Sequence, residues 1–156
     1  MGQVAEEAVS IFMQGYNCAQ SVLLACARRY GLDDRTAMRM ASAFGGGMTI
    51  GLTCGAVTGA LMAIGLKHAK TGLGDERPQA NAIIKQFYER FTARHGSMIC
   101  KILLGADLAD PVQAKDIHEK RLSRSVCPPY VRSAVEILEE LLPELSTQGE
   151  KASPNS

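Results

Sequence analysis

Four of the five cysteines in this sequence lie where a thiol could be chemically active. Each is at or near the predicted start of a helix: Cys18 follows the predicted N-cap Asn17, Cys54 follows the predicted cap Thr53, Cys100 comes three residues after the predicted cap Ser97, and Cys127 directly precedes Pro128 and Pro129. The first turn of a helix carries unpaired N–H groups and the positive end of the helix dipole, and both stabilise a thiolate. The thiolate is the form of cysteine that binds a metal, attacks a disulfide or is oxidised. The sequence therefore indicates one site for redox or metal chemistry, made of these four cysteines.

The spacing of the cysteines does not by itself identify their chemistry. The four are separated by 36, 46 and 27 positions, which matches no CxxC zinc pattern and no ferredoxin pattern. Each one alone could equally be a buried, inert residue, because free cysteine behaves as a small hydrophobic side chain. The fifth, Cys26, lies in the middle of a predicted helix beside Leu23 and Leu24, so we interpret it as a core residue.

The histidines offer few further catalytic groups. His68 and His95 lie near the ends of predicted helices, where a positive charge is favoured, and His118 lies in a charged helix. His95 comes five residues before Cys100, so it is the best candidate to assist a thiol. The glycines at 45–47 are not followed by the Gly-Lys-Ser/Thr of a phosphate loop, and the sequence has no nucleophile elbow. Nucleotide chemistry and conventional hydrolase chemistry are therefore not supported.

The elements that must position the cysteines are helices. Apolar residues recur at helical spacing along the chain, and no segment alternates with a period of two. We expect an all-α, single-domain bundle of about six to eight helices. The predicted helices cover about residues 4–14, 18–30, 34–44, 54–69, 78–94, 98–104, 111–122 and 127–142, with a loop over 71–75. The helical four-cysteine domain should span 1–145, and the polar composition of 146–156 predicts a disordered C-terminal tail.

Small residues form a stripe along the predicted fourth helix. Gly55, Gly59 and Ala63 are four positions apart, so another helix could approach this side closely. That helix could belong to the same chain or to a second copy, which would give a homodimer. Gly55 and Gly59 could also let the backbone come close to a cofactor.

Composition excludes several classes of partner. The net charge is +1, aromatic residues make up 5% of the chain and tryptophan is absent, so a nucleic-acid partner is not expected. The first ten residues do not resemble a secretory signal. The weakly polar stretch over 52–66 is too short for membrane insertion, which takes about 20 apolar residues. We expect a soluble, cytoplasmic protein, in which cysteines more often act as ligands or redox thiols than as permanent disulfides.

Several motifs together resemble a known family. They are Tyr16-Asn17-Cys18-Ala19-Gln20-Ser21, Cys54-Gly55-Ala56-Val57-Thr58-Gly59 after Gly51, His95-Gly96-Ser97 leading to Cys100, and Cys127. In this respect the sequence resembles the C_GCAxxG_C_C family, described as redox-active proteins with four cysteines and a CGAxxG motif. The resemblance covers nearly all of the chain, from Val4 to Leu142. It implies a redox role for Cys18, Cys54, Cys100 and Cys127, and leaves Cys26 outside the pattern. Family members are often associated with transporter loci, which implies a partner linked to a transporter.

The chemistry of such a site stays open between an iron–sulfur cluster and a dithiol/disulfide couple. Four convergent thiolates would be unstable without a cation or oxidation, and their number slightly favours the cluster. Cys54 is the predicted most reactive thiol, because its glycine-rich flanks should leave it least shielded. The sequence does not decide between an oxidoreductase and an electron carrier, nor does it identify the redox partner.

Two interpretations without redox chemistry also remain. In one, the four thiolates bind structural zinc and the protein is a helical interaction module, since closed zinc sites have no redox chemistry. In the other, the cysteines only pack inside a helical scaffold or a small-molecule binder.

Overall fold

The computed structural model describes residues 2–68 and 78–147. These residues contain ten α-helices and no named strand, so the predicted all-α class is confirmed. The helices are α1 Gln3–Met13, α2 Cys18–Ala27, α3 Asp34–Ala41, α4 Gly55–His68, α5 Pro78–His95, α6 Cys100–Leu104, α7 Pro111–Glu119, α8 Leu122–Val126, α9 Pro128–Leu141 and α10 Glu144–Thr147. Of the expected segments without helix, the loop over 71–75 and residues 148–156 of the tail lie outside the described residues.

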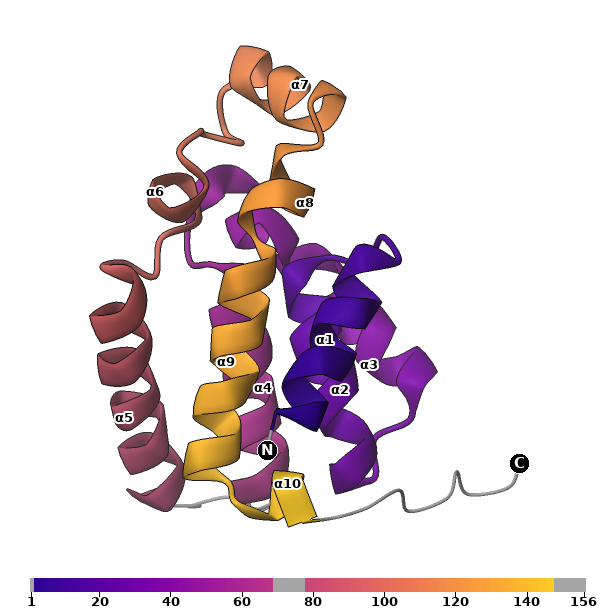
Figure 1. Ribbon diagram of the computed structural model, residues 1–156, viewed down its shortest axis with the longest axis vertical. Coiled ribbons are helices and arrows are strands. Elements are labelled where there is room, and N and C mark those ends of the chain that lie inside the picture. Colours follow the sequence, from indigo (N-terminus) through magenta and orange to yellow (C-terminus); the bar gives the residue numbers. More distant parts are fainter. Residues whose placement is uncertain (1, 69–77, 148–156) are drawn as a thin grey trace, which may run out of the picture.

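The long helices form a bundle around α9, and short helices cover one end of it. α9 contacts α1, α2, α4 and α5, and α2 also packs on α4. In Figure 1, α2, α4 and α9 all begin at the upper end of the bundle, where α6 and α8 also lie. This up-and-down course of the chain brings together helix starts that are far apart in the sequence.

The start of α2 has the cap that the sequence predicts. Asn17 Oδ1 accepts a hydrogen bond from the Gln20 backbone N–H at 2.8 Å, and Gln20 Oε1 accepts one from the Asn17 N–H at 3.0 Å. This reciprocal capping box fixes the first turn of the helix. Cys18 is thereby placed in that turn.

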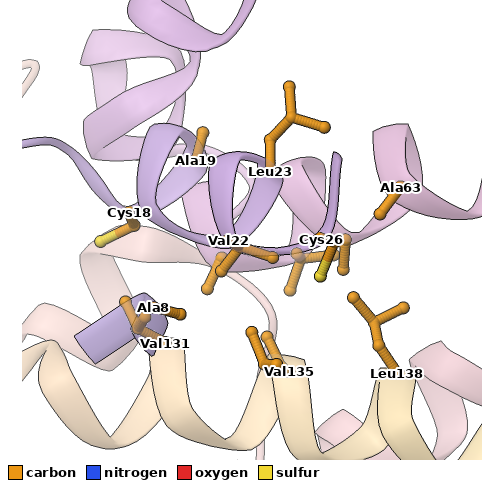
Figure 2. Packing of buried hydrophobic residues seen from close by; sticks show 14 of the residues in the cluster. Ala8, Cys18, Ala19, Val22, Leu23, Cys26, Ala63, Val131, Val135 and Leu138 are labelled. Atoms are coloured by element: carbon orange, nitrogen blue, oxygen red, sulfur yellow. The ribbon is translucent and has the colours of Figure 1, made fainter. Parts of the chain in front are cut away.

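α2 is the central helix of the core. Nine of its ten residues are buried, because α1, α3, α4 and α9 all pack against it. Figure 2 shows Val22 and Cys26 on the side of α2 that faces Val131, Val135 and Leu138 of α9. Cys26 is 0% exposed, so its predicted role as a core residue is confirmed.

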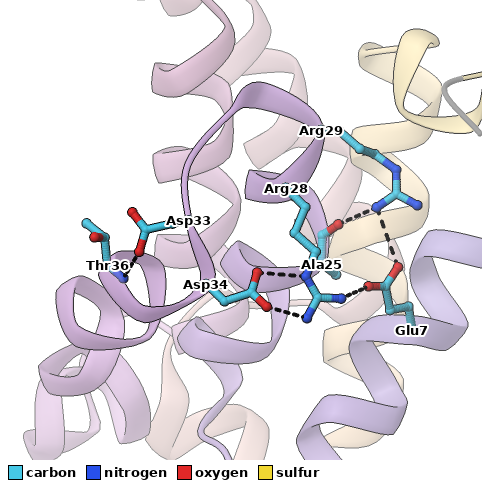
Figure 3. Close-up of polar contacts among 7 residues, drawn as sticks. All are labelled: Glu7, Ala25, Arg28, Arg29, Asp33, Asp34 and Thr36. Carbon is cyan, nitrogen blue, oxygen red and sulfur yellow. Dashed lines mark hydrogen bonds and ion pairs between the residues drawn. The ribbon is translucent and has the colours of Figure 1, made fainter. Parts of the chain in front are cut away.

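Ion pairs connect helices on the surface of the bundle. Arg28 binds Asp34 through Nε at 2.7 Å and Glu7 through Nη1 at 2.6 Å (Figure 3). Arg94 likewise joins α5 to Glu136 and Glu140 of α9. Exposed pairs of this kind stabilise a fold by about 0–1 kcal/mol each, so the apolar core dominates.

Three local features differ from the expectation. α8 is a separate helix that the sequence does not predict, because Arg121 adopts a left-handed conformation (φ 49°) and divides it from α7. α10 extends to residue 147, two residues into the expected tail, because Leu145 is buried against the bundle. The glycine-rich segment forms an irregular turn over Gly47–Gly51, in which Met48 and Thr49 also have positive φ.

None of the described helices is both long and apolar enough to span a membrane.

Candidate thiol site

Four thiols gather where helix starts converge. Cys18 and Cys100 are the first residues of α2 and α6. Cys54 and Cys127 occupy the cap positions of α4 and α9, since their carbonyls accept the first hydrogen bonds of those helices. All four are buried, with exposed fractions between 5% and 8%. The interaction with Cys127, burial, and negative charge on Cys127, Cys54 or Cys100 all raise the pKa of Cys18, in that order of size.

Cys18 and Cys127 are the largest influence on each other's pKa. Their interaction raises the pKa of Cys18 and lowers the pKa of Cys127, so Cys18 keeps its proton and Cys127 is the more easily ionised of the two. Ser123 also lowers the pKa of Cys127. The start of α9 adds the positive end of a helix dipole, which favours a thiolate at this position.

Cys54 and Cys100 are held beside each other by a short backbone bridge. Thr53 and Ile99 form an antiparallel β-bridge. The Cys54 N–H donates to the Met98 carbonyl at 2.7 Å, and the Cys100 N–H donates to the Leu52 carbonyl at 2.5 Å. These bonds fix two segments that are more than forty positions apart in the sequence.

Burial keeps this second pair of thiols protonated. Burial raises the pKa of Cys54 to about 12, although its sulfur accepts backbone hydrogen bonds from Ala56 and Val57 that act in the opposite direction. Burial, followed by the charge of Cys127, raises the pKa of Cys100 to about 11. A neutral thiol is a weak nucleophile, so these two residues are poor first attackers.

The expectation that its glycine-rich flanks leave Cys54 the least shielded of the four thiols is wrong. Cys54 is 5% exposed, less than any other member of the group. The thiol with a lowered pKa is Cys127. The predicted cap of α4 also moves by one residue, from Thr53 to Cys54.

Gly55 and Gly59 contact α2 of the same chain. A Cβ on Gly59 would lie 2.7 Å from the Ala19 carbonyl oxygen, and one on Gly55 would lie 3.1 Å from the Cβ of Cys18. This stripe of small residues thus lets α4 approach α2 closely, and this close approach places Cys18 at the start of α2 beside α4. That these glycines also approach a cofactor stays a prediction.

The three consecutive glycines at 45–47 belong to the wall of the site, which the sequence does not reveal. A Cβ on Gly47 would lie 2.7 Å from the Cβ of Cys100, and one on Gly45 would lie 2.5 Å from the Cβ of Asn17. Only the glycine run itself hints at such close packing, and by sequence it indicates no more than a helix break. Ser123 is a further site residue that the sequence does not predict, because the chain gives no local sign that it contacts Cys127.

His95 packs against aromatic rings. It ends α5, as predicted, and its ring centroid lies 4.8 Å from that of Phe91 and 4.9 Å from that of Tyr130. Burial lowers its pKa, and its Nε2 atom is buried without a hydrogen-bond partner in the described part of the chain. His95 therefore packs against rings, and its Nε2 makes no hydrogen bond to a thiol of the described residues. That His95 assists a thiol stays a prediction.

The arrangement of the four side chains bears on whether they could hold a metal. Within residues 2–68 and 78–147, no three or more His, Cys, Asp or Glu side chains are grouped so that they could hold a metal ion. A cluster or a zinc ion needs four ligands directed at one centre, so binding of either by the four cysteines stays a prediction.

The chain was compared with known proteins. A family model described as "Putative redox-active protein (C_GCAxxG_C_C)" matches residues 16–141, a range that contains all four cysteines of the site. No curated protein and no solved structure matches the chain.

Proposed function

Because the chain belongs to the C_GCAxxG_C_C family, whose description is redox-active, we propose that Cys18 and Cys127 are a redox pair that cycles between two thiols and one disulfide. The observation that carries the proposal is the meeting of the starts of α2 and α9, at which Cys18 and Cys127 lie, together with the opposite pKa shifts that these two thiols impose on each other. A dithiol catalyst needs this combination of one thiolate that attacks and a second thiol that resolves.

The two cysteines have different tasks in the proposed reaction. The Cys127 thiolate attacks one sulfur of an oxidised partner's disulfide and forms a mixed disulfide, and the partner's other sulfur leaves as a thiolate. That thiolate takes the proton of Cys18. The Cys18 thiolate then attacks the Cys127 sulfur, the Cys18–Cys127 disulfide forms, and the partner's second thiol leaves after taking a proton from water. Two electrons pass from the protein to the partner, and the reverse sequence reduces the protein.

Cys54 and Cys100 lie beside the Cys18–Cys127 pair and take no part in the proposed reaction. Their raised pKa values keep them neutral, which limits the negative charge near the Cys127 thiolate. This division of the four cysteines into one active pair and one neutral pair is part of the proposal.

Disulfide mapping tests the proposal directly. The reduced protein is treated with one equivalent of a disulfide oxidant, the remaining thiols are alkylated, and the peptides are identified by mass spectrometry. We expect Cys18 linked to Cys127, with Cys26, Cys54 and Cys100 alkylated. Cys26→Ser should give the same linkage and Cys127→Ser should give none. Linkage through Cys54 or Cys100, or no disulfide at all, would overturn the assignment.

A second measurement separates the thiol couple from the metal alternatives. The protein is purified without oxygen, its visible spectrum is recorded before and after dithionite, and its zinc content is determined. We expect a colourless protein without stoichiometric zinc. A broad absorption that bleaches on reduction would replace the couple with an iron–sulfur centre, and one zinc per chain would replace it with a structural zinc module.

A further inference from the structure

A cavity of about 660 Å³ lies between the start of α2, the glycine-rich segment and helices α7 and α8. Small-molecule sites commonly have volumes of about 300–1,000 Å³, so this cavity has room for a metabolite-sized molecule. The glycines at 45 and 46 line it. Gly46 has φ +63°, and a Cβ at this position would lie 2.7 Å from Leu108, so a side chain here would fill part of the space.

The cavity lies beside the redox pair, although its lining contains neither Cys18 nor Cys127. Ser123 lines it and also lowers the pKa of Cys127. Asn17 lines it too, caps α2 and is the residue directly before Cys18. A molecule in the cavity would therefore be next to residues that neighbour both cysteines.

The ionisable side chains that line the cavity are all basic. His118, Arg121 and Arg124 line the cavity, and its lining contains no aspartate or glutamate among the described residues. Arg124 donates a hydrogen bond to the Met13 carbonyl oxygen at 2.6 Å, a neutral partner that leaves its charge uncompensated. Within the part of the chain that the structure describes, neither Arg121 nor Arg124 has an ion-pair partner within 4.0 Å, whereas Arg28, Arg90, Arg94 and Arg132 all do.

Arg121 is also held in an unfavourable backbone conformation. Its φ of 49° and ψ of 43° are left-handed, where glycine or asparagine would be less strained. The chain has an arginine at this position, and its side chain lines the cavity. A long cationic side chain is thus retained where the backbone favours a smaller residue.

From these observations we propose that the cavity binds a small anionic disulfide, which is the oxidant of the Cys18–Cys127 pair. This proposal rests on the function proposed above. Arg121 and Arg124 attract the carboxylates of the ligand, and its disulfide is attacked by Cys127. The ligand's S–S bond breaks as the Cys18–Cys127 bond forms, so one small disulfide and two protein thiols give two small thiols and one protein disulfide.

The test compares a charged oxidant with a neutral one. Reduced protein is mixed with glutathione disulfide, which carries carboxylates and a net negative charge, or with uncharged hydroxyethyl disulfide, and the rate of Cys18–Cys127 formation is measured. The variants are Arg121→Gln with Arg124→Gln, and Arg39→Gln as the control. Arg39 is an exposed residue of α3 that does not line the cavity.

We expect the double variant to react with glutathione disulfide about tenfold or more slowly than the wild type, because charge-assisted hydrogen bonds to carboxylates are strong. Its rate with hydroxyethyl disulfide should be unchanged, and Arg39→Gln should match the wild type with both oxidants. An unchanged rate with glutathione disulfide would overturn the proposal. An equal loss with both oxidants would also overturn it, because it would mean structural damage.

Calorimetry separates a failure of the cavity from a failure of the redox pair. Glutathione disulfide is titrated into the Cys18→Ser/Cys127→Ser variant, which cannot form this disulfide, with and without the two arginine substitutions. Binding that disappears with the arginines supports the cavity even if the wild type forms no Cys18–Cys127 disulfide, and only the redox pair would then fail. Absence of binding, or binding that is independent of the arginines, overturns the cavity while leaving disulfide mapping to judge the pair.

Discussion

At the scale of single residues, neighbouring cysteines of one cluster have different acidity because each sulfur has different neighbours. Cys18 and Ser123 both lower the pKa of Cys127. Cys54 is buried more completely, and its pKa rises to about 12. Desolvation disfavours a thiolate and donated hydrogen bonds favour it, so the local balance of the two decides which thiol ionises first.

Replacing Cys18 with Ala should raise the pKa of Cys127, because the interaction that lowers this pKa most is lost. The measurement is the ultraviolet absorbance of thiolate in the reduced protein as a function of pH. The first thiol to titrate should do so at higher pH in Cys18→Ala than in the wild type. Cys26→Ala serves as the control and should leave this first titration in place. An identical first titration in Cys18→Ala would contradict the pairing.

Cys26 should make the fold less stable at alkaline pH. Burial raises its pKa from 9.0 to about 12, so the folded protein keeps a proton that the unfolded chain releases. This contribution to stability is complete below pH 9.0 and is lost as pH rises towards 12. Over that window it lowers the free energy of unfolding by about 1.4 kcal/mol per pH unit. Urea unfolding across this range should show a steeper decline for the wild type than for Cys26→Ala, and parallel curves would refute the assignment.

At the scale of elements, the geometry of the site depends on how closely α4 approaches α2. Gly59 lies against the backbone of Ala19, which cannot move without shifting the whole helix. Gly55 lies against Ala19 and Cys18 in the same interface. The CGAxxG motif therefore has a packing role as well as a chemical one, because its two glycines allow the close approach of α4 and α2 that places Cys18 near Cys127.

Gly59→Ala should destabilise the protein by about 1–3 kcal/mol, because the new methyl group would lie 2.7 Å from the Ala19 carbonyl oxygen. Gly65, in the same helix, provides the matched control, because a Cβ at this position would meet no atom within 4 Å. Gly65→Ala should be neutral or stabilise by up to about 1 kcal/mol, because alanine favours the helix. Chemical denaturation of both variants is the measurement. Equal effects would show that the close approach does not matter.

At the scale of the whole molecule, the fold joins cysteines from both ends of the chain. The chain runs up and down the bundle, so α2, α4 and α9 begin at the same end (Figure 1). Cys18 and Cys127 become neighbours although most of the described chain lies between them. Oxidation of this pair would close a loop over residues 18–127 and tie the first half of the bundle to α9.

Oxidation should therefore raise the stability of the wild type. In the chain-entropy model a disulfide over a loop of this length contributes on the order of 4 kcal/mol, mainly by restricting the unfolded chain. The thermal unfolding midpoint of the oxidised protein should exceed that of the reduced protein. Cys18→Ser treated with the same oxidant should show no such increase. An oxidised wild type that melts with or below the reduced form would mean that a different or strained disulfide had formed.

The sequence by itself determined the features that depend on near neighbours. Helical periodicity predicted the all-α class, Asn17 predicted the cap of α2, and the apolar residues around Cys26 predicted its burial. Each rests on residues within about one or two helical turns of one another, where spacing and side-chain chemistry are sufficient.

Only the tertiary structure decided which of the four thiols lie together as pairs. Cys18 interacts most strongly with Cys127, while the backbone around Cys54 pairs with the segment that carries Cys100. The same packing covers Cys54, which its glycine-rich flanks had suggested would be open, and sets Ser123 against Cys127. These contacts join residues distant in sequence, and a thiol's pKa depends on the burial and hydrogen bonds that such contacts create. No local pattern contains that information, because it arises only when the helix starts meet.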